Sequence, residues 1–194
     1  MLIHFPVHGA PRIYQKSVIQ VERIGVTGRV QTAVWEASAE PWLLNDPLRL
    51  LHPERCREHL LRLDPWRMNK VVATSVGGFG YGLNLIRDLL AGETALFPTH
   101  VAWGTNGTAP AVSDVGLYAE KVRTDIVARA KGDKQLIIGG FMGSTTGNGD
   151  TFQEAALVTG MLSSAWRLFA RVAINPIAKS VNVIISVSWQ IDLA

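Results

Sequence analysis

The carboxyl-terminal segment of the chain, 181–193, constrains the fold more than any other stretch. Apolar residues occupy every second position, and polar residues occupy the positions between them, with Ile184 the only exception. The apolar set comprises Val181, Val183, Ile185, Val187, Trp189, Ile191 and Leu193. A repeat of two sends alternate side chains to opposite faces of a β-strand, whereas a helix repeats every ~3.6 residues. The segment therefore predicts a long strand with one face on a core.

Shorter strand-like runs, separated by turn-forming residues, precede this strand. The expected strands lie at 70–76, 99–104, 135–143, 152–160 and 166–174. The expected loops and turns lie at 105–114, 131–134 and 144–151. Segment 117–130 fits either a helix or a bent strand. Short strands joined by polar turns favour a mainly β fold, and we expect an antiparallel β-sandwich, jelly-roll-like, with one or two short helices.

The first 76 residues are less regular. Segment 12–36 has apolar residues at strand-like intervals, and we expect two strands there with a turn near 26–28. Four prolines follow between positions 41 and 65, and Pro53 and Asp64 bound an expected helix at 53–63. Because two strands alone are marginal in water, we predict an extended N-terminal assembly region, 1–76, ahead of a β-sandwich domain, 77–194.

Composition disfavours several classes of protein. Hydrophobic residues make up 47% of the chain and charged residues 18%, which suits a packed core. The formal net charge is +3 and the basic residues are scattered, so we expect no nucleic-acid partner. No run reaches the ~18 apolar residues of a membrane helix, so we expect no membrane span. The single cysteine, Cys56, cannot form an intrachain disulfide.

A glycine-rich stretch, 75–92, has the outline of a phosphate loop that opens a helix. Four glycines precede apolar residues at helical spacing, which predicts a helix from Leu83 that stops at Gly92. A Walker loop needs a Lys followed by Ser or Thr at the helix start, and a dinucleotide loop needs G-x-G-x-x-G. This chain has neither, because its glycines are spaced G-x-G-x-G ahead of Leu83. We expect no nucleotide and no other cofactor, and we interpret the glycines as a tight turn.

His52, Cys56 and His59 are the candidate metal ligands. On the expected helix they occupy positions i, i+4 and i+7 of one face, where zinc could take two nitrogens and one sulfur. A fourth ligand is not evident in the sequence. We therefore favour Cys56 as a small buried residue among Leu60 and Leu63, and we expect no metal.

Glu154 is the acidic residue that stands inside a strand-like run. Such a carboxylate either pairs with a basic residue on a neighbouring strand or serves in acid–base chemistry. We favour an ion pair with Arg167 or Arg171. The nucleophile motif G-x-S-x-G does not occur in the sequence, and we expect no catalytic residues and no enzymatic activity.

Tryptophans are the candidate interface residues, since Trp brings a large contact area at low entropic cost. Trp35, Trp42 and Trp66 lie in the irregular half of the chain and are the candidates for contacts with other subunits. Trp166 and Trp189 have strand context and are expected in the core or an interface. A row of exposed aromatic side chains could instead bind sugars.

Six short motifs follow one another in the order of a known family, and they lie in four stretches of the second half of the chain. These stretches are LNLIRDLLAG at 83–92, THVAWGTNGTAPAVSDVGLYAEKVR at 99–123, FMGSTTGNGDTFQEAALV at 141–158 and LFARVAINPIAKSVNVIISVSWQIDL at 168–193. With these motifs the region 83–193 resembles a family of small structural proteins of tailed bacteriophages. The chain departs from the family pattern at GTNGT, where GTGTT is more usual, and at QEAAL, where TEAGL is.

The resemblance implies a structural component of the virion, assembled in the cytoplasm of the bacterial host. It implies a place in the tail, at the baseplate or where a fibre attaches, and partners that are further copies of the chain in a homo-oligomer and other virion proteins. Two alternatives stay open: a head decoration (cement) protein that stabilises the capsid, and a carbohydrate-binding adhesion module that recognises a host surface glycan.

Overall fold

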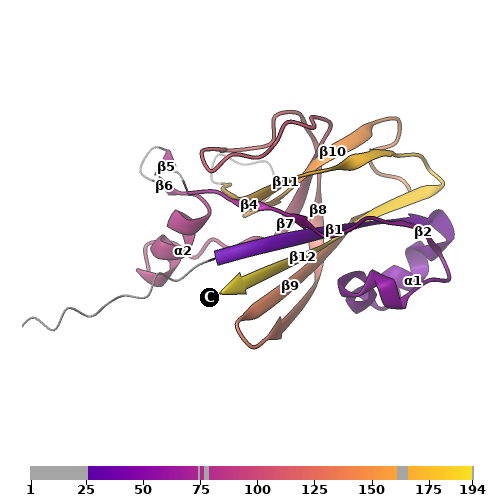
Figure 1. Ribbon diagram of the computed structural model, residues 1–194, viewed down its shortest axis with the longest axis horizontal. Coiled ribbons are helices and arrows are strands. Elements are labelled where there is room, and N and C mark those ends of the chain that lie inside the picture. Colours follow the sequence, from indigo (N-terminus) through magenta and orange to yellow (C-terminus); the bar gives the residue numbers. More distant parts are fainter. Residues whose placement is uncertain (1–25, 74, 77–78, 161–165, 194) are drawn as a thin grey trace, which may run out of the picture.

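The computed structural model describes residues 26–73, 75–76, 79–160 and 166–193, which build mainly antiparallel β-structure (Figure 1). Ten strands form one sheet in the order β2-β1-β12-β9-β8-β7-β10-β11-β4, and β3 pairs with β1 beside β2. These strands are β1 (Val26–Glu36), β2 (Leu60–Leu63), β3 (Arg67–Met68), β4 (Lys70–Val71), β7 (His100–Gly104), β8 (Glu120–Gly132), β9 (Gln135–Met142), β10 (Thr151–Val158), β11 (Leu168–Ala178) and β12 (Val183–Leu193). The mainly β, antiparallel fold expected from the sequence is confirmed.

Short helices and a small hairpin complete the described structure. The α-helices are α1 (Glu40–Asn45) and α2 (Leu83–Leu90), and the 3-10 helices are η1 (Ala37–Ala39), η2 (Pro47–Leu51) and η3 (Pro53–Arg55). β5 (Ser75–Val76) and β6 (Phe79–Gly80) pair with each other alone. Two α-helices agree with the expectation, and α1 and α2 lie at opposite ends of the sheet in Figure 1. Among the described residues, no helix is both long and apolar enough to span a membrane.

The sheet curls because β8 belongs to both of its halves. The first part of β8 pairs with β7, from Glu120 to Asp125, and the second part pairs with β9, from Ile126 to Gly132. The register shifts between Ile126 and Ala128, and such a bulge bends a strand. The two halves thereby face each other across one core, to which β7 contributes Trp103 and β12 contributes Trp189.

The strand expected at the carboxyl terminus is confirmed as β12, but both of its faces are buried. Val187 and Trp189 face the core inside the curl, whereas Val181 precedes the strand and is 60% exposed. On the opposite face Ser186 and Ser188 are buried as well, because η1, α1 and η2 cover them. The covering layer contributes Ala39, Leu43 and Leu50 to a second apolar cluster, where they pack with Trp35 of β1, Phe141 of β9 and Ile184 of β12.

The two buried serines of β12 are both hydrogen bonded, Ser186 to the neighbouring strand β1 and Ser188 to the covering layer. The indole Nε1 of Trp35 donates to the Ser186 hydroxyl over 2.7 Å. The Ser188 hydroxyl donates to the backbone carbonyl of Leu50. A buried hydroxyl is costly unless it finds a partner, so Ser188 helps to determine where η2 attaches to the sheet.

The N-terminal half differs from the expectation in two places. β1 runs unbroken from Val26 through Gly28 to Glu36, so there is no turn near 26–28, and the other expected strand lies outside the described residues. The helix expected at 53–63 is wrong: η3 covers Pro53–Arg55 and β2 covers Leu60–Leu63. β2 pairs with β1, with Ala33 opposite Leu63. Segment 60–63 is therefore a strand, because pairing with β1 outweighs its intrinsic helix propensity.

β1 joins the two halves of the sequence in one sheet. It pairs with β12 along its whole length, from Val26 opposite Leu193 to Glu36 opposite Val183. Val30 and Val34 of β1 lie in the same core cluster as Trp189. In the described part of the chain, residues from before and after position 76 therefore share a core, and the assembly role of residues 1–76 stays a prediction.

Candidate functional site

Three buried charged side chains form an ion cluster in the half of the sheet that contains β7, β10 and β11. Arg171 of β11 and Glu154 of β10 are both fully buried, and their side chains are paired with Nε to Oε2 at 2.8 Å. Asp114, at the end of the loop 105–114, receives a hydrogen bond on Oδ2 from Arg171 over 3.0 Å. The ion pair expected between Glu154 and Arg171 is confirmed.

The same cluster fastens the connection between β7 and β8, residues 105–119, which we call the clamped loop. Arg171 donates to the carbonyl of Thr108 over 2.9 Å. Glu154 accepts the backbone N–H of Ala119 over 2.9 Å and that of Tyr118 over 3.3 Å. Asp114 closes its own turn by accepting the N–H of Ala111 over 2.9 Å. The charged groups thus replace the strand partners that a long irregular loop lacks.

The cluster has a structural role, because its charged groups are buried and their hydrogen-bonding atoms have partners within the protein. The Arg171 guanidinium is distributed among Glu154, Asp114 and Thr108, and its carbon lies 4.4 Å from the centroid of the Tyr118 ring. The Tyr118 hydroxyl donates to the other oxygen of Asp114 over 3.1 Å. Charges buried in this manner are tolerated because each is paired and hydrogen bonded. A catalytic carboxylate needs access to a substrate, and Glu154 has none.

The clamped loop presents apolar side chains to the surface. Val112 is 53% exposed, Val115 is 46% exposed and Tyr118 is 56% exposed. Large side chains held outward on a fixed backbone lose little entropy when a partner covers them. The arrangement can therefore serve as a contact surface for another protein.

Sequence analysis missed Asp114 and the clamp. Glu154 and Arg171 are separated by 17 positions, and Asp114 and Arg171 by 57 positions. A usable signal was present, because each member lies within one of the motifs behind the phage-family resemblance: Asp114 in APAVSD, Glu154 in QEAAL and Arg171 in LFAR. Arg167, the other expected partner of Glu154, donates instead to the carbonyl of Trp166 over 2.8 Å.

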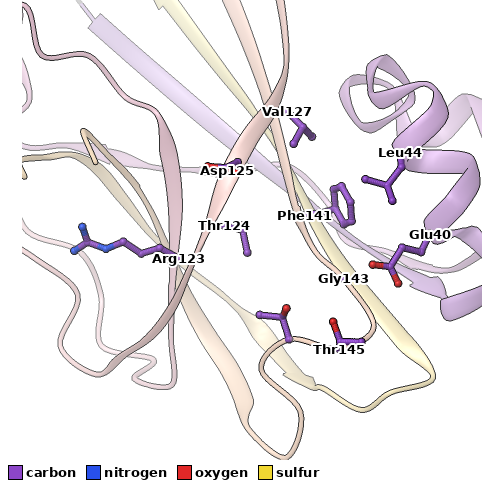
Figure 2. Close-up of a pocket in the computed structure, with 10 residues that line it drawn as sticks. Glu40, Leu44, Arg123, Thr124, Asp125, Val127, Phe141, Gly143 and Thr145 are labelled. Carbon is purple, nitrogen blue, oxygen red and sulfur yellow. The ribbon is translucent and has the colours of Figure 1, made fainter. Parts of the chain in front are cut away.

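A cleft opens where α1 approaches β8 and β9 (Figure 2). It has a volume of about 300 Å³ and is lined by Glu40, Leu44, Arg123, Thr124, Asp125, Val127, Phe141, Gly143, Thr145 and Thr146. Figure 2 shows Leu44 beside the Phe141 ring and the Arg123 side chain directed away from the cleft. Besides Arg123, the polar residues of the lining are three threonines and two carboxylates.

Both carboxylates of this cleft are engaged in internal contacts. Glu40 accepts the backbone N–H of Ser144 over 3.0 Å and also the Ser144 hydroxyl. Asp125 Oδ1 lies 3.1 Å from Nε2 of His100. The contacts of Glu40 tie the loop between β9 and β10 to α1, which gives this carboxylate a structural role.

Lys179 holds the same loop from the other side. It is 3% exposed, and its Nζ donates to Asn148 Oδ1 and to the Ser180 carbonyl, each over 2.9 Å. Burial lowers the pKa of Lys179, and the Glu40 carboxylate raises it by a smaller amount. The Lys179 ammonium group therefore has a structural role, which is to hold this loop in place.

The three candidate metal ligands do not share a face, because the helix on which they were placed is absent. His52 Nδ1 lies 3.4 Å from Glu54, and His59 Nδ1 lies 3.8 Å from Glu36. Cys56 packs with Leu60 and Leu63 against the second apolar cluster, as expected, but it is only partly buried. Within the described residues, no group of three His, Cys, Asp or Glu side chains is placed to hold a metal ion.

The tryptophans divide between core and surface. Trp35 is fully buried and is therefore a core residue, not an interface residue. Trp42 is half-buried with Arg49 4.1 Å from its ring centroid, and Trp66 is 36% exposed with Arg29 at 5.0 Å. Trp103 and Trp189 are fully buried, and Trp166 is half-buried. The six rings thus form no exposed row for sugars.

Three amides at the start of α2 that could face a phosphate already have acceptors within the protein. The N–H of Gly80 donates to Asp88, that of Gly82 to the Leu168 carbonyl and that of Leu83 to the Val72 carbonyl. Gly82 has a φ of +55° and lies against the Val72 backbone, where no Cβ fits. The helix itself is confirmed, and Gly92 follows it with a φ of +74°.

Comparison with known proteins adds no relative: no family model, curated protein or solved structure matches the chain.

Proposed function

We propose that the protein is a non-enzymatic structural component of a tailed-phage virion, acting in the tail through contacts with its own copies and with other virion proteins. One observation carries the proposal: the motifs behind the phage-family resemblance meet in the Asp114–Arg171–Glu154 cluster. In the cluster, three buried charged side chains hold the clamped loop in place. The motif residues thus build a rigid surface for contact.

The composition of that surface supports assembly. Val112, Val115 and Tyr118 are apolar or amphipathic, and apolar side chains rimmed by polar residues mark sites of protein–protein contact. In a symmetric particle every copy uses the same surface, so the total buried area grows with the number of copies even where each contact is small. Trp66, with Met68 at 69% exposure nearby in β3, offers a second surface on the N-terminal half.

A head decoration protein is the rival within the same class. It would use the same surface against capsid subunits. A carbohydrate-binding module is less well supported, because three tryptophans are fully buried and the rings of Trp42 and Trp66 are each covered by an arginine.

Imaging of particles tests the proposal and separates the rivals. We expect particles made without this protein to show missing fibres or an incomplete baseplate by negative-stain microscopy. Fragile or collapsed heads with normal tails would identify a decoration protein. Normal particles that contain none of the protein would overturn the virion role, and specific binding on a glycan array would then favour the adhesion module.

Variants of the clamped loop test the contact surface itself. Val112→Glu with Val115→Glu should abolish incorporation into particles, because charge replaces apolar contact, while the purified protein keeps its fold. Val181→Glu is the matched control, since Val181 is 60% exposed and lies outside the loop. Incorporation that is equal for the double variant and the control would contradict a contact role for this loop.

A further inference from the structure

An apolar groove lies at the α2 end of the curled sheet, where the core opens to the surface. Its volume is about 460 Å³, and its walls include Ile86 and Leu89 of α2, Phe97 of the following loop and Leu136 of β9. Its floor is formed by core residues such as Phe169 and Ile191, which are each 5% exposed. The groove is therefore an unclosed end of the main core.

The groove leaves large apolar side chains uncovered. Leu89 is 42% exposed, Phe97 is 54% exposed and Leu193 is 46% exposed. A contiguous apolar surface of this kind is costly in water and is normally covered by a partner or by the chain itself.

The first described residue of the chain, Val26, lies beside this groove. Val26 begins β1 and pairs with Leu193, which lines the groove. Any residue just before Val26 is thus tethered within a few residues of the groove, and a short tether gives an effective concentration on the order of mM.

We propose that residues 18–24 of the chain's own N-terminal segment dock in this groove. The segment reads VIQVERI and supplies Val18, Ile19, Val21 and Ile24 for apolar contact. Seven extended residues reach about 23 Å, which exceeds the ~12 Å length of an eight-residue helix such as α2. The segment is long enough to follow the groove wall.

Charge is complementary as well. Arg129 is the one charged residue among the ten that line the groove. Glu22 is the one acidic residue among residues 1–25, and it stands within the proposed docking segment. A partly desolvated pair of this kind fixes register more than it adds affinity. The inference does not rest on the virion role, because it concerns the isolated full-length chain.

Disulfide trapping in the full-length protein tests the docking. Ile19→Cys is combined with Leu89→Cys in a Cys56→Ser background, and the oxidised product is analysed by non-reducing electrophoresis and mass spectrometry. The control pair is Ile19→Cys with Leu44→Cys, because Leu44 is 59% exposed on α1, at the opposite end of the sheet (Figure 1). We expect an intrachain disulfide that forms at least tenfold faster in the groove pair than in the control pair. Equal rates, or no disulfide in the groove pair, would overturn the proposal, and a disulfide between chains would identify a second copy as the occupant.

Hydrogen exchange gives a second readout that does not depend on one register. Val18→Glu with Val21→Glu should raise amide exchange in α2 and at the end of β12, because the groove loses its cover. Leu2→Glu with Ile3→Glu adds the same charge outside the docking segment and should leave exchange there unchanged. Identical exchange in the parent and the Val18/Val21 variant would refute docking in the groove.

Discussion

Arg171 and Glu154 are both removed from solvent, and the Arg171 Nε–H donates to Glu154 Oε2 over 2.8 Å. Arg171→Met should lower the free energy of unfolding by ~3–5 kcal/mol, because it leaves the Glu154 and Asp114 carboxylates buried without a counter-ion. Urea unfolding measures the difference. Arg55→Met is the control, since the Arg55 side chain is 75% exposed and should cost less than ~0.5 kcal/mol. A loss for Arg171→Met that equals the control would show that the cluster does not stabilise the fold.

Val187 tests the position of β12 in the core. Its side chain is fully buried, so Val187→Asp should cost on the order of 3 kcal/mol or more by burying an unpaired charge. Val181→Asp adds the same charge six positions earlier, where the side chain is 60% exposed, and should be nearly neutral. Thermal unfolding compares the two. Similar melting temperatures for both variants would mean that the core face is assigned to the wrong residues.

Gly140 tests how closely the two half-sheets approach each other. A Cβ at this position would lie 2.8 Å from Val101 Cγ2 and 3.2 Å from the Asp125 carbonyl. Gly140→Ala should therefore destabilise the protein by ~1–3 kcal/mol through overpacking. At Gly132 the nearest atom would be 3.8 Å away, so Gly132→Ala is the tolerated counterpart. The urea concentrations at the midpoint of unfolding are compared for the parent and the two variants. An unchanged midpoint for Gly140→Ala would rule out the close contact.

Cys56 provides a test by pH. Burial raises the pKa of the Cys56 thiol above its ordinary value of 9.0, with Arg49 opposing and Glu54 reinforcing the shift. A raised pKa means less thiolate at any given pH below it, so native Cys56 should react with iodoacetamide more slowly than the unfolded chain at about pH 8.5. The rate should rise with pH to an inflection above 9.0. An inflection below that value would instead indicate a nearby cation or a bound metal, which deprotonates a coordinating thiol.

Nucleotides should not bind at the start of α2. Titration calorimetry with ATP, GTP and NAD is expected to show no heat of binding, because the amides of Gly80, Gly82 and Leu83 already have protein acceptors. Gly92→Ala, beyond the other end of the helix, serves as the reference variant. A micromolar signal that disappears in Gly80→Val but persists in Gly92→Ala would establish a phosphate site after all.

The amino-acid sequence determined the elements that local patterning controls. The alternation of residues 181–193 indicates a strand regardless of its neighbours, and β12 is that strand. The apolar spacing after Leu83 and the stop at Gly92 likewise specify α2. In both places the period of side chains along one short segment selects a single backbone conformation. Segment 117–130 lacked such a clean period, and its strand conformation comes from pairing with β7 and β9.

Tertiary structure alone decided what those elements contact. Ser186 and Ser188 alternate with apolar residues, as residues on a solvent-facing side of a strand do. Ser188 is nevertheless covered by the helical layer, through Leu50, which lies 138 positions earlier in the chain. Residues 60–63 became a strand because β1 offered them an edge. Asp114, Glu154 and Arg171 carry no local mark of a common site, since they meet only when the curled sheet brings β10, β11 and the clamped loop together. Periodicity reports the face of a residue, whereas the layer that covers this face depends on long-range packing, which the topology of the sheet decides.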